Sequence, residues 1–318
     1  MRVLVTGGAG FIGSHLCEAL LARGDEVVCL DNFNDYYDPA RKRANVAAFI
    51  THPRCSLVEA DVRDREGLAA LFERVGGFDA IAHLAAMAGV RASVPRAVLY
   101  TEVNVLGTVH LLDLARDYGV GNFVFASTSS VYGRTRRLPF VEDDVADRPL
   151  APYPATKRAC EMMGHAYHNM HGLNFTALRF FSVYGPRGRP DMMPYRIVHR
   201  LVHDQIITLF EGGRMRRDWT YVDDIVQGVV AALDRPLGYE VINLGRGEPI
   251  WMDRFVRILE ALVGKKARLE TPPAPASEPP VTYADIGKAR RLLDYRPMTS
   301  VEEGLARLWA WYQAEMGV

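Results

Sequence analysis

The sequence has few of the residues from which metal sites and nucleic-acid surfaces are built. It contains only four cysteines in 318 residues, and their spacing fits no metal site. Lys and Arg together number 38, as do Asp and Glu, so no excess charge of one sign favours a nucleic acid or a membrane surface. We therefore predict no metal site and no nucleic-acid or membrane partner, and we expect any recognition of an anion to be local.

Long apolar segments are missing as well. No apolar run approaches the roughly 20 residues that span a bilayer. No charged leader with an apolar core precedes the first apolar run, which begins at residue 2. Cys17, Cys29, Cys55 and Cys160 are interpreted as free thiols in a reducing compartment. Together these features predict a cytoplasmic protein.

A glycine-rich turn comes directly after the first apolar run. Gly8, Gly10 and Gly13 form a G-x-G-x-x-G pattern between an apolar run at 2–6 and a helical pattern at 14–23, as in dinucleotide-binding folds. Asp31 ends the next apolar run, where a carboxylate accepts hydrogen bonds from the adenosine ribose and repels a 2′-phosphate. The sequence therefore predicts a bound dinucleotide and favours NAD over NADP.

Short apolar runs alternate with helical patterns over the first 181 residues. Strands are predicted near 2–6, 26–31, 56–60, 79–84, 122–127 and 175–181, and helices near 12–23, 65–75, 97–118 and 155–171. This alternation predicts an α/β fold with a doubly wound parallel sheet of the Rossmann type. We expect an NAD-binding domain at 1–181, to which 221–246 returns, and a smaller, mostly C-terminal substrate-binding lobe at 182–318.

Tyr153 and Lys157 stand four residues apart in a helical pattern, which places both on one helix face. With 14 Tyr and five Lys in the chain, this spacing arises by chance roughly 0.2 times, so the pair alone is weak evidence. Thr128 ends a preceding apolar run, and together these three residues can move a proton beside a nicotinamide. A free Tyr has a pKa near 10, so Lys157 and the positive nicotinamide must lower it by about three units.

These motifs resemble those of the extended short-chain dehydrogenase/reductases of the nucleotide-sugar epimerase and dehydratase type, along essentially the whole chain. The resemblance rests on 6–13 (TGGAGFIG), 61–62 (DV), 83–86 (HLAA), 104–108 (NVLGT), 127–133 (STSSVYG), 153–157 (YPATK) and 217–224 (RDWTYVDD). It implies that Thr128, Tyr153 and Lys157 are catalytic. The cofactor-binding residues that we assign, beside Tyr153 and Lys157, are Gly7, Gly10, Phe11, Ile12, Gly13, Asp31, Asn32, Asp61, Val62, Leu84, Ala85, Ala86, Asn104, Ser127 and Phe180. The substrate-binding residues that we assign, beside Thr128, are Arg91, Ser129, Ser130, Ser182, Arg189, Phe210, Arg217 and Glu278.

The two residues after Thr128 indicate the type of reaction. Dehydratases and decarboxylases of the group usually carry an acid at one of these positions, where this chain has Ser129 and Ser130. Segments 31–39 (DNFNDYYDP) and 180–192 (FFSVYGPRGRPDM) resemble those of UDP-glucuronate 4-epimerases. The resemblance thus implies NAD-dependent 4-epimerisation of UDP-glucuronate to UDP-galacturonate through a transient 4-keto sugar. The alternatives are a UDP-glucose 4-epimerase, a UDP-glucuronate decarboxylase, a nucleotide-sugar 4,6-dehydratase and an NAD-binding regulator without catalysis.

Two further expectations concern the substrate lobe and assembly. Relatives usually have an Arg-x-Gly-Asp-like stretch where this chain has 275–278 (PASE); Glu278 can replace the acid, but the arginine is absent. Relatives also form homodimers through a four-helix bundle. Apolar residues that would pair in such a bundle are Val98, Val105, Val109, Leu112, Ala115, Ala159, Met162, Met163 and Ala166.

Overall fold

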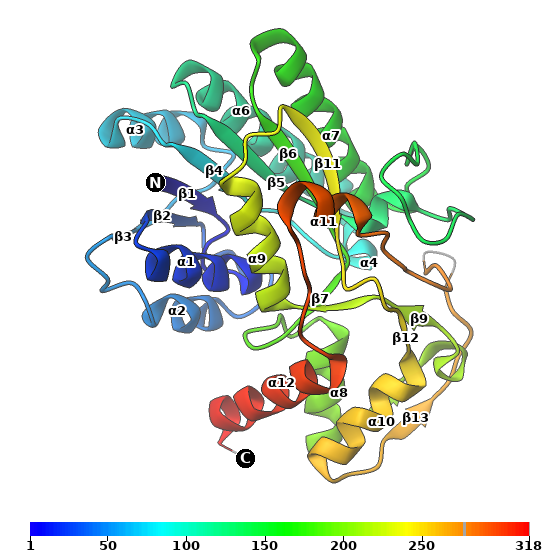
Figure 1. Ribbon diagram of the computed structural model, residues 1–318. Coiled ribbons are helices and arrows are strands. Elements are labelled where there is room, and N and C mark those ends of the chain that lie inside the picture. Colours follow the sequence, from blue (N-terminus) through cyan, green and yellow to red (C-terminus); the bar gives the residue numbers. More distant parts are fainter. Residues whose placement is uncertain (276–277, 318) are drawn as a thin grey trace.

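A seven-stranded parallel sheet forms the centre of the molecule in the computed structural model, which describes residues 1–275 and 278–317 (Figure 1). Its strand order is β11-β6-β5-β4-β1-β2-β3. The strands are β1 (Arg2–Thr6), β2 (Glu26–Asp31), β3 (Cys55–Glu59), β4 (Ala80–His83), β5 (Asn122–Thr128), β6 (Phe175–Phe180) and β11 (Tyr239–Leu244). The order reverses at β1, where β4 and β2 lie on opposite sides, and ligands of open α/β sheets bind at such a point.

Helices cover both faces of this sheet (Figure 1). One face carries α1 (Phe11–Arg23), α2 (Pro39–Ala47), α9 (Val222–Leu233) and α11 (Gly287–Leu293), and the other α3 (Arg65–Val75), α6 (Gly107–Asp117) and α7 (Pro152–His171). Alternate strand residues divide between two apolar cores: Val3 and Val5 pack in the core with α1 and α9, whereas Leu4 packs in the core with α3 and α6. The predicted α/β fold with a doubly wound parallel sheet is confirmed.

Two of the helical segments that differ from the prediction hold residues of the site. The helix expected near 97–118 is divided into α5 (Ala97–Tyr100), a π-helical stretch, η2 (Thr101–Leu106), and α6. The helix α2 was not predicted, because its residues are mostly polar and give no apolar face. Both differences bear on the site, since η2 holds Asn104 and α2 holds Lys42.

The remaining elements lie mainly beyond the carboxyl edge of the sheet, in the lower part of Figure 1. They are α4 (Val90–Ser93), η1 (Val94–Arg96), η3 (Ser129–Tyr132), β7 (Ser182–Tyr184), α8 (Met193–Val202), β8 (Ile206–Thr208), η4 (Phe210–Gly213), β9 (Arg216–Arg217), β10 (Trp219–Tyr221), β12 (Ile250–Trp251), α10 (Met252–Val263), β13 (Arg268–Glu270) and α12 (Val301–Met316). Short strands pair β7 with β10, β8 with β13 and β9 with β12. Among the described helices, none is both long and apolar enough to cross a bilayer.

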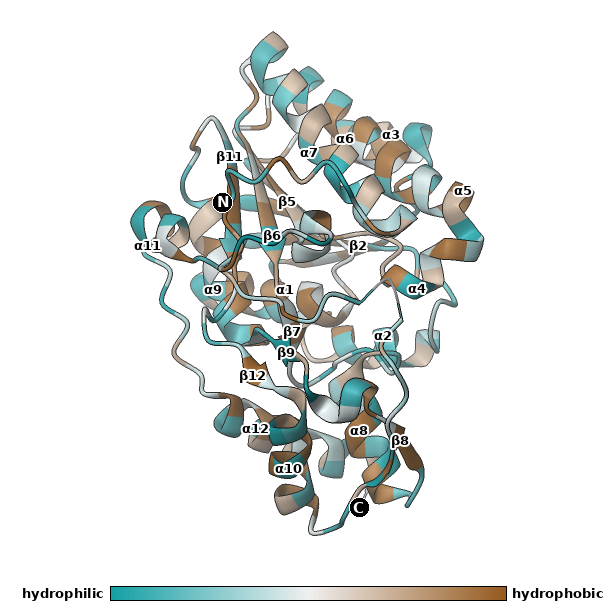
Figure 2. Ribbon diagram, turned by 90° about the vertical axis from the view of Figure 1, so that its right-hand side faces the viewer, coloured by the Kyte–Doolittle hydropathy of each residue, from teal (hydrophilic) through white to brown (hydrophobic). Residues whose placement is uncertain are grey.

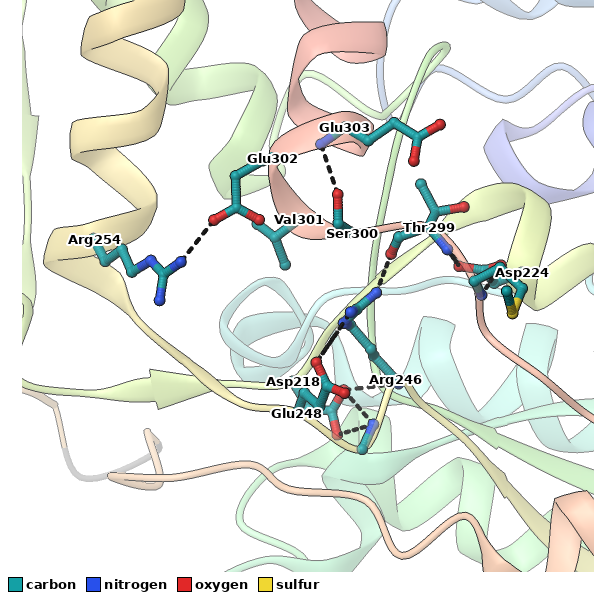
Figure 3. A network of polar contacts seen from close by, with 12 residues as sticks. Asp218, Asp224, Arg246, Glu248, Arg254, Thr299, Ser300, Val301, Glu302 and Glu303 are labelled. Atoms are coloured by element: carbon teal, nitrogen blue, oxygen red, sulfur yellow. Dashed lines mark hydrogen bonds and ion pairs between the residues drawn. The ribbon is translucent and has the colours of Figure 1, made fainter.

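A buried carboxylate holds this second part of the chain together (Figure 3). Asp218 accepts hydrogen bonds from the backbone N–H groups of Arg246 at 2.8 Å, Ala284 at 2.9 Å and Gly247 at 3.1 Å. The side chain of Arg246 donates to the carbonyl oxygen of Thr299, just before α12. The carboxylate of Asp218, just before β10, therefore holds the turn after β11 and the segment before α11 by hydrogen bonds.

Candidate active site

The glycine-rich turn between β1 and α1 leaves no room for side chains. Gly7 has φ +70°, and a Cβ on it would lie 2.7 Å from the backbone nitrogen of Ala85. A Cβ on Gly13 would lie 2.1 Å from the carbonyl oxygen of Gly7. The helix α1 starts directly after Gly10 without a side-chain cap, so its first N–H groups face an adjoining cavity of about 350 Å³. Such a helix end, with backbone on all sides, fits a pyrophosphate.

Asp31 lies at the end of β2, and the structure gives it a partner that the sequence did not indicate. Its Oδ1 accepts a hydrogen bond from the backbone N–H of Phe33 at 2.9 Å and lies 3.4 Å from Nζ of Lys42. Lys42 is buried and also donates to Oδ1 of Asn34 at 3.2 Å. Both Asp31 and Lys42 line the cavity, so Lys42 joins the candidate ribose site.

Most predicted cofactor residues come together along the same cavity. The lining includes the predicted residues Gly7, Gly10, Phe11, Ile12, Gly13, Asp31, Asn32, Val62, Leu84, Ala85, Ala86, Ser127, Tyr153, Lys157 and Phe180. Asp61 is not among the lining residues. Its carboxylate accepts hydrogen bonds from Arg63 and from Asn32, and these bonds lower its pKa from 3.8 to about 2.

Asn104 does not line the cavity but lies directly behind it. Its amide exchanges two hydrogen bonds with the backbone of Met87, at 2.8 and 3.0 Å, and donates to Oγ1 of Thr156 at 2.9 Å. These bonds use both ends of the side chain. Asn104 therefore fixes the loop that follows β4 and the start of α7.

The three predicted catalytic residues lie at one end of the cavity. Thr128 ends β5, and its Oγ1 accepts a hydrogen bond from the backbone N–H of Ser130 at 3.1 Å. Tyr153 and Lys157 project from the first turns of α7, whose start is held by the bond from the Tyr153 backbone N–H to Oγ of Ser93 at 3.1 Å. All three line the cavity.

The electrostatics of Tyr153 differ from the expectation. Burial raises the pKa of the Tyr153 phenol, and the groups that oppose this shift are Arg189 and the hydroxyl of Thr128 rather than Lys157. Burial lowers the pKa of Lys157 to about 8, and its Nζ lies 4.5 Å from the centroid of the Phe125 ring. The protein groups alone therefore do not lower the pKa of Tyr153 toward neutral pH.

Hydroxyl groups and one arginine surround the catalytic end. Ser129, Ser130, Ser182 and Arg189 all line the cavity beside Thr128 and Tyr153. Arg189 pairs with Asp191, with Nε 2.9 Å from Oδ1. Among the described residues that line this cavity and its extension toward Arg217, the acids are Asp31, at the cofactor end, and Glu278. The catalytic end thus has donors for an anion and no acid beside Thr128.

The extension of the cavity holds two of the residues predicted for the nucleotide part of the substrate. Arg217 and Glu278 line it and form an ion pair, with Nη2 3.1 Å from Oε2. Arg91 and Phe210 are not among the residues that line the cavity or its extension; they contact each other, with the guanidinium carbon 5.9 Å from the ring centroid. Two residues of the unusual stretch before Glu278, Ala276 and Ser277, lie outside the described residues.

The residues around the cavity therefore fit a dinucleotide, and comparison with known proteins gives the family. The model of the NAD dependent epimerase/dehydratase family matches residues 3–245, and the chain belongs to this family. The expected cofactor, NAD, is confirmed.

Individual relatives extend this result over nearly the whole chain. A UDP-glucuronate 4-epimerase of Thermodesulfobacterium geofontis is 43% identical over 309 residues, which are 97% of this chain and 95% of that protein. The crystal structure of UDP-glucuronic acid 4-epimerase from Bacillus cereus in complex with UDP-glucuronic acid and NAD is 36% identical, with a TM-score of 0.92 and coverage of 99% and 100%. The dTDP-glucose 4,6-dehydratase DesIV of Streptomyces venezuelae is 34% identical, with a TM-score of 0.92 and coverage of 100% and 98%. Because the fold is shared between an epimerase and a dehydratase, the reaction must be argued from the site.

Proposed function

We propose that the protein is an NAD-dependent epimerase that interconverts UDP-glucuronate and UDP-galacturonate at C4 of the sugar. The observation that carries the proposal is the make-up of the catalytic end, where Ser129, Ser130 and Ser182 stand with Arg189 and without an acid beside Thr128. Hydroxyl and guanidinium donors hold a carboxylate, whereas elimination of water needs a further acid or base. The relatives named as UDP-glucuronate 4-epimerases support the same substrate.

The proposed mechanism gives each catalytic residue one task. Tyr153 removes the proton from the 4-hydroxyl of the sugar, and Thr128 holds the same oxygen by a hydrogen bond. Bound NAD would supply the acceptor for the hydride from C4 of the sugar, and the same hydride would go back to the opposite face of the 4-keto sugar. Lys157 would contact the bound cofactor and add its positive charge at this end of the cavity. Tyr153 gives the proton back once the 4-keto sugar has turned over.

The carboxylate of the sugar needs firm positioning during this cycle. A 4-keto glucuronate is a β-keto acid and loses carbon dioxide when the bond to the carboxylate aligns with the carbonyl. Hydrogen bonds from Ser129, Ser130 and Ser182, with the charge of Arg189, would keep it in another orientation. Each charge-assisted bond contributes roughly 1.5 to 3 kcal/mol.

Arg217 and Glu278 are the proposed contacts to the diphosphate and ribose of the UDP group. Their ion pair keeps the guanidinium in place at the end of β9. A guanidinium suits a diphosphate because it forms two parallel hydrogen bonds. Arg91 and Phe210 complete the proposed uracil side.

We also propose that the protein is a homodimer, paired through α5, η2 and α7. Val98, Leu106, Met162 and Met163 are exposed, between 40% and 73%, and Figure 2 shows the hydrophobic colour of α5 at the edge of the molecule. Leu112 and Ala115, which were expected at this interface, are buried in the core of the monomer instead.

The cytoplasm is the proposed location of the protein. Four free thiols support it, of which Cys17, Cys29 and Cys160 are buried.

Separation of the products formed from single UDP-sugars tests the function. UDP-glucuronate should give UDP-galacturonate, and the reverse reaction should run at a comparable rate without added NAD. Appearance of a UDP-pentose as the main product would instead identify a decarboxylase. Equal turnover of UDP-glucose would identify a UDP-glucose 4-epimerase. Light scattering that gives a mass of 35.5 kDa at micromolar concentration would refute the dimer.

A further inference from the structure

A buried ion cluster lies behind the catalytic residues and takes no part in the proposed proton and hydride transfers. Glu161, on α7, has no exposed surface, and Arg179, on β6, is 1% exposed. Arg179 donates from Nε to Oε1 of Glu161 at 2.9 Å and from Nη2 to Oε2 at 2.8 Å. Arg158 adds a bond to Oε2 at 2.9 Å. A two-point pair of this kind in a dry interior fixes both side chains tightly.

A further hydrogen bond joins the Glu161 carboxylate to the residue before Thr128. Ser127 donates from Oγ to Oε1 at 2.5 Å, and Ser127 is the residue before Thr128 on β5. Ser127 is also the cross-strand neighbour of Arg179, as Thr128 is of Phe180. Glu161 thus bonds to the ends of two neighbouring strands at the level of Thr128.

The same carboxylate belongs to the catalytic helix. Glu161 follows Lys157 by four residues and Tyr153 by eight, so all three lie on one face of α7. The bonds of Glu161 to Ser127 and Arg179 therefore set the position of α7 along its axis relative to the ends of β5 and β6. Thr128 and Tyr153 must bind one hydroxyl of the substrate between them. A shift of about 1 Å in such an arrangement costs up to about a hundredfold in rate.

The small net stability expected of a buried ion pair also indicates that the cluster serves to fix the position of α7. A buried ion pair is often no more stabilising than apolar residues of similar size, because removing two charges from water offsets their attraction. An apolar contact would fill this space but would not fix direction or register. The cluster is therefore better explained by the position it imposes than by the stability it adds.

We propose that Glu161 is a positioning residue of the active site, which holds α7 against the ends of β5 and β6 so that Thr128, Tyr153 and Lys157 meet. The charge of Glu161 also acts on Lys157. The groups that face Lys157 are Cys160 and Glu161 on its own helix and His83 on β4. Burial raises the pKa of the Cys160 thiol and lowers the pKa of His83, so both groups are neutral at neutral pH. Glu161 is then the charged group of the three, and its charge favours the ammonium form of Lys157.

The variant Glu161→Gln tests the proposal, because it removes the negative charge and keeps the size and shape of the side chain. This inference rests on the proposed catalytic roles of the three residues, so one readout needs no substrate. The chain has five lysines, so selective 13Cε labelling gives five NMR signals, and Lys157→Met identifies the one from Lys157. In Glu161→Gln the Lys157 titration should move to lower pH by at least about half a unit, because a neighbouring negative charge is lost. An unchanged titration would overturn the proposed charge effect, whatever the protein's substrate.

Activity on UDP-glucuronate gives the second readout. In Glu161→Gln we expect kcat to fall about ten- to a hundredfold, with KM changed less than about threefold, since the substrate contacts remain. The loss of activity at alkaline pH should begin at lower pH than in the wild type. Normal kcat with only a lower melting temperature would show a merely structural role and overturn the proposal.

A double variant distinguishes a loss of positioning from a loss of folding. Glu161→Gln with Arg179→Gln leaves no unpaired buried charge, so its melting temperature should recover toward the wild type. Its kcat should stay low, and a return of kcat to the wild-type value would overturn the proposal. Its Lys157 titration should return toward the wild type, because the positive charge of Arg179 is removed together with the negative charge of Glu161. The matched control is Glu260→Gln on α10, a nearly buried acid bonded to Lys266 and to the backbone of Ala267, where neither readout should change.

Discussion

The guanidinium of Arg189 forms a two-point ion pair with the carboxylate of Asp191, with Nε 2.9 Å from Oδ1 and Nη2 3.0 Å from Oδ2. Asp191 also accepts a hydrogen bond from the hydroxyl of Tyr36 at 3.2 Å, and the Arg189 guanidinium carbon lies 5.6 Å from the Tyr36 ring centroid. These contacts fix the plane of the guanidinium at the edge of the cavity. The positive charge therefore has a set direction before any substrate arrives, which favours selection among substrates by charge.

The first prediction concerns this selection. In Arg189→Met, the preference for UDP-glucuronate over UDP-glucose should fall at least about tenfold, because one charge-assisted contact to the sugar carboxylate is lost. The preference is measured as the ratio of kcat/KM for the two substrates. Arg200→Met is the control, since Arg200 donates to the carbonyl oxygen of Ile206 outside the cavity. An unchanged ratio in Arg189→Met would exclude Arg189 from carboxylate recognition.

A second prediction addresses the proton transfer. Tyr153→Phe keeps the ring that packs beside Tyr100, so the fold and the bound NAD should persist. The rate should fall more than about a hundredfold, the usual scale for loss of a general acid or base. Steady-state rates, with the NAD content measured in the same preparation, check both statements. Near-normal turnover would mean that another group moves the proton.

The cofactor gives a third prediction. Because the hydride is returned in each cycle, purified protein should contain NAD, visible in its absorbance and after release by chromatography. Asp31→Ala should lose this nucleotide, since the proposed contact to the ribose is removed and Lys42 loses its ion pair with Asp31. Asp25→Ala, at the opposite end of β2 and paired with Arg23, should retain it. A requirement for stoichiometric NADPH would contradict the proposed reaction.

How far the sequence predicts this site is seen best in Asp31 and Lys42. Asp31 was predicted because a carboxylate at the end of the second strand is part of a local pattern. Lys42 was not predicted, because it lies on the short polar helix α2. It comes close to Asp31 only because the turn between β2 and α2 folds back. The strands and the catalytic helix were predicted for the same reason as Asp31: apolar periodicity and motif spacing are local signals.

Asn104 and Glu161 show the other limit. Asn104 was assigned to the cofactor, yet its amide is used by Met87 and Thr156, which lie 17 and 52 residues away. Glu161 gives no signal of its own, since a glutamate in a helix is most often exposed. Its burial depends on Arg179, in an apolar strand, and this pairing exists only once α7 packs on β6.

The last prediction concerns acid stability and rests on His83. His83 is fully buried between Oγ1 of Thr6, 2.6 Å from Nδ1, and Oγ1 of Thr108, 3.0 Å from Nε2, and burial lowers its pKa from 6.5 to about 3. Between pH 6.5 and 3, His83 is protonated in the unfolded chain and neutral in the folded protein. The folded protein therefore loses stability as the pH falls through this window. The advantage of the wild type over His83→Gln in unfolding free energy should shrink by roughly 4 kcal/mol from pH 7 to pH 3. Asp218 supplies the opposite case, because burial raises its pKa from 3.8 to about 6 and the folded protein then binds the extra proton. The advantage of the wild type over Asp218→Asn should grow as the pH falls from 6 to 4. Urea titrations at each pH measure both differences, and a His83→Gln difference that does not change with pH would refute the assignment of a neutral, buried imidazole.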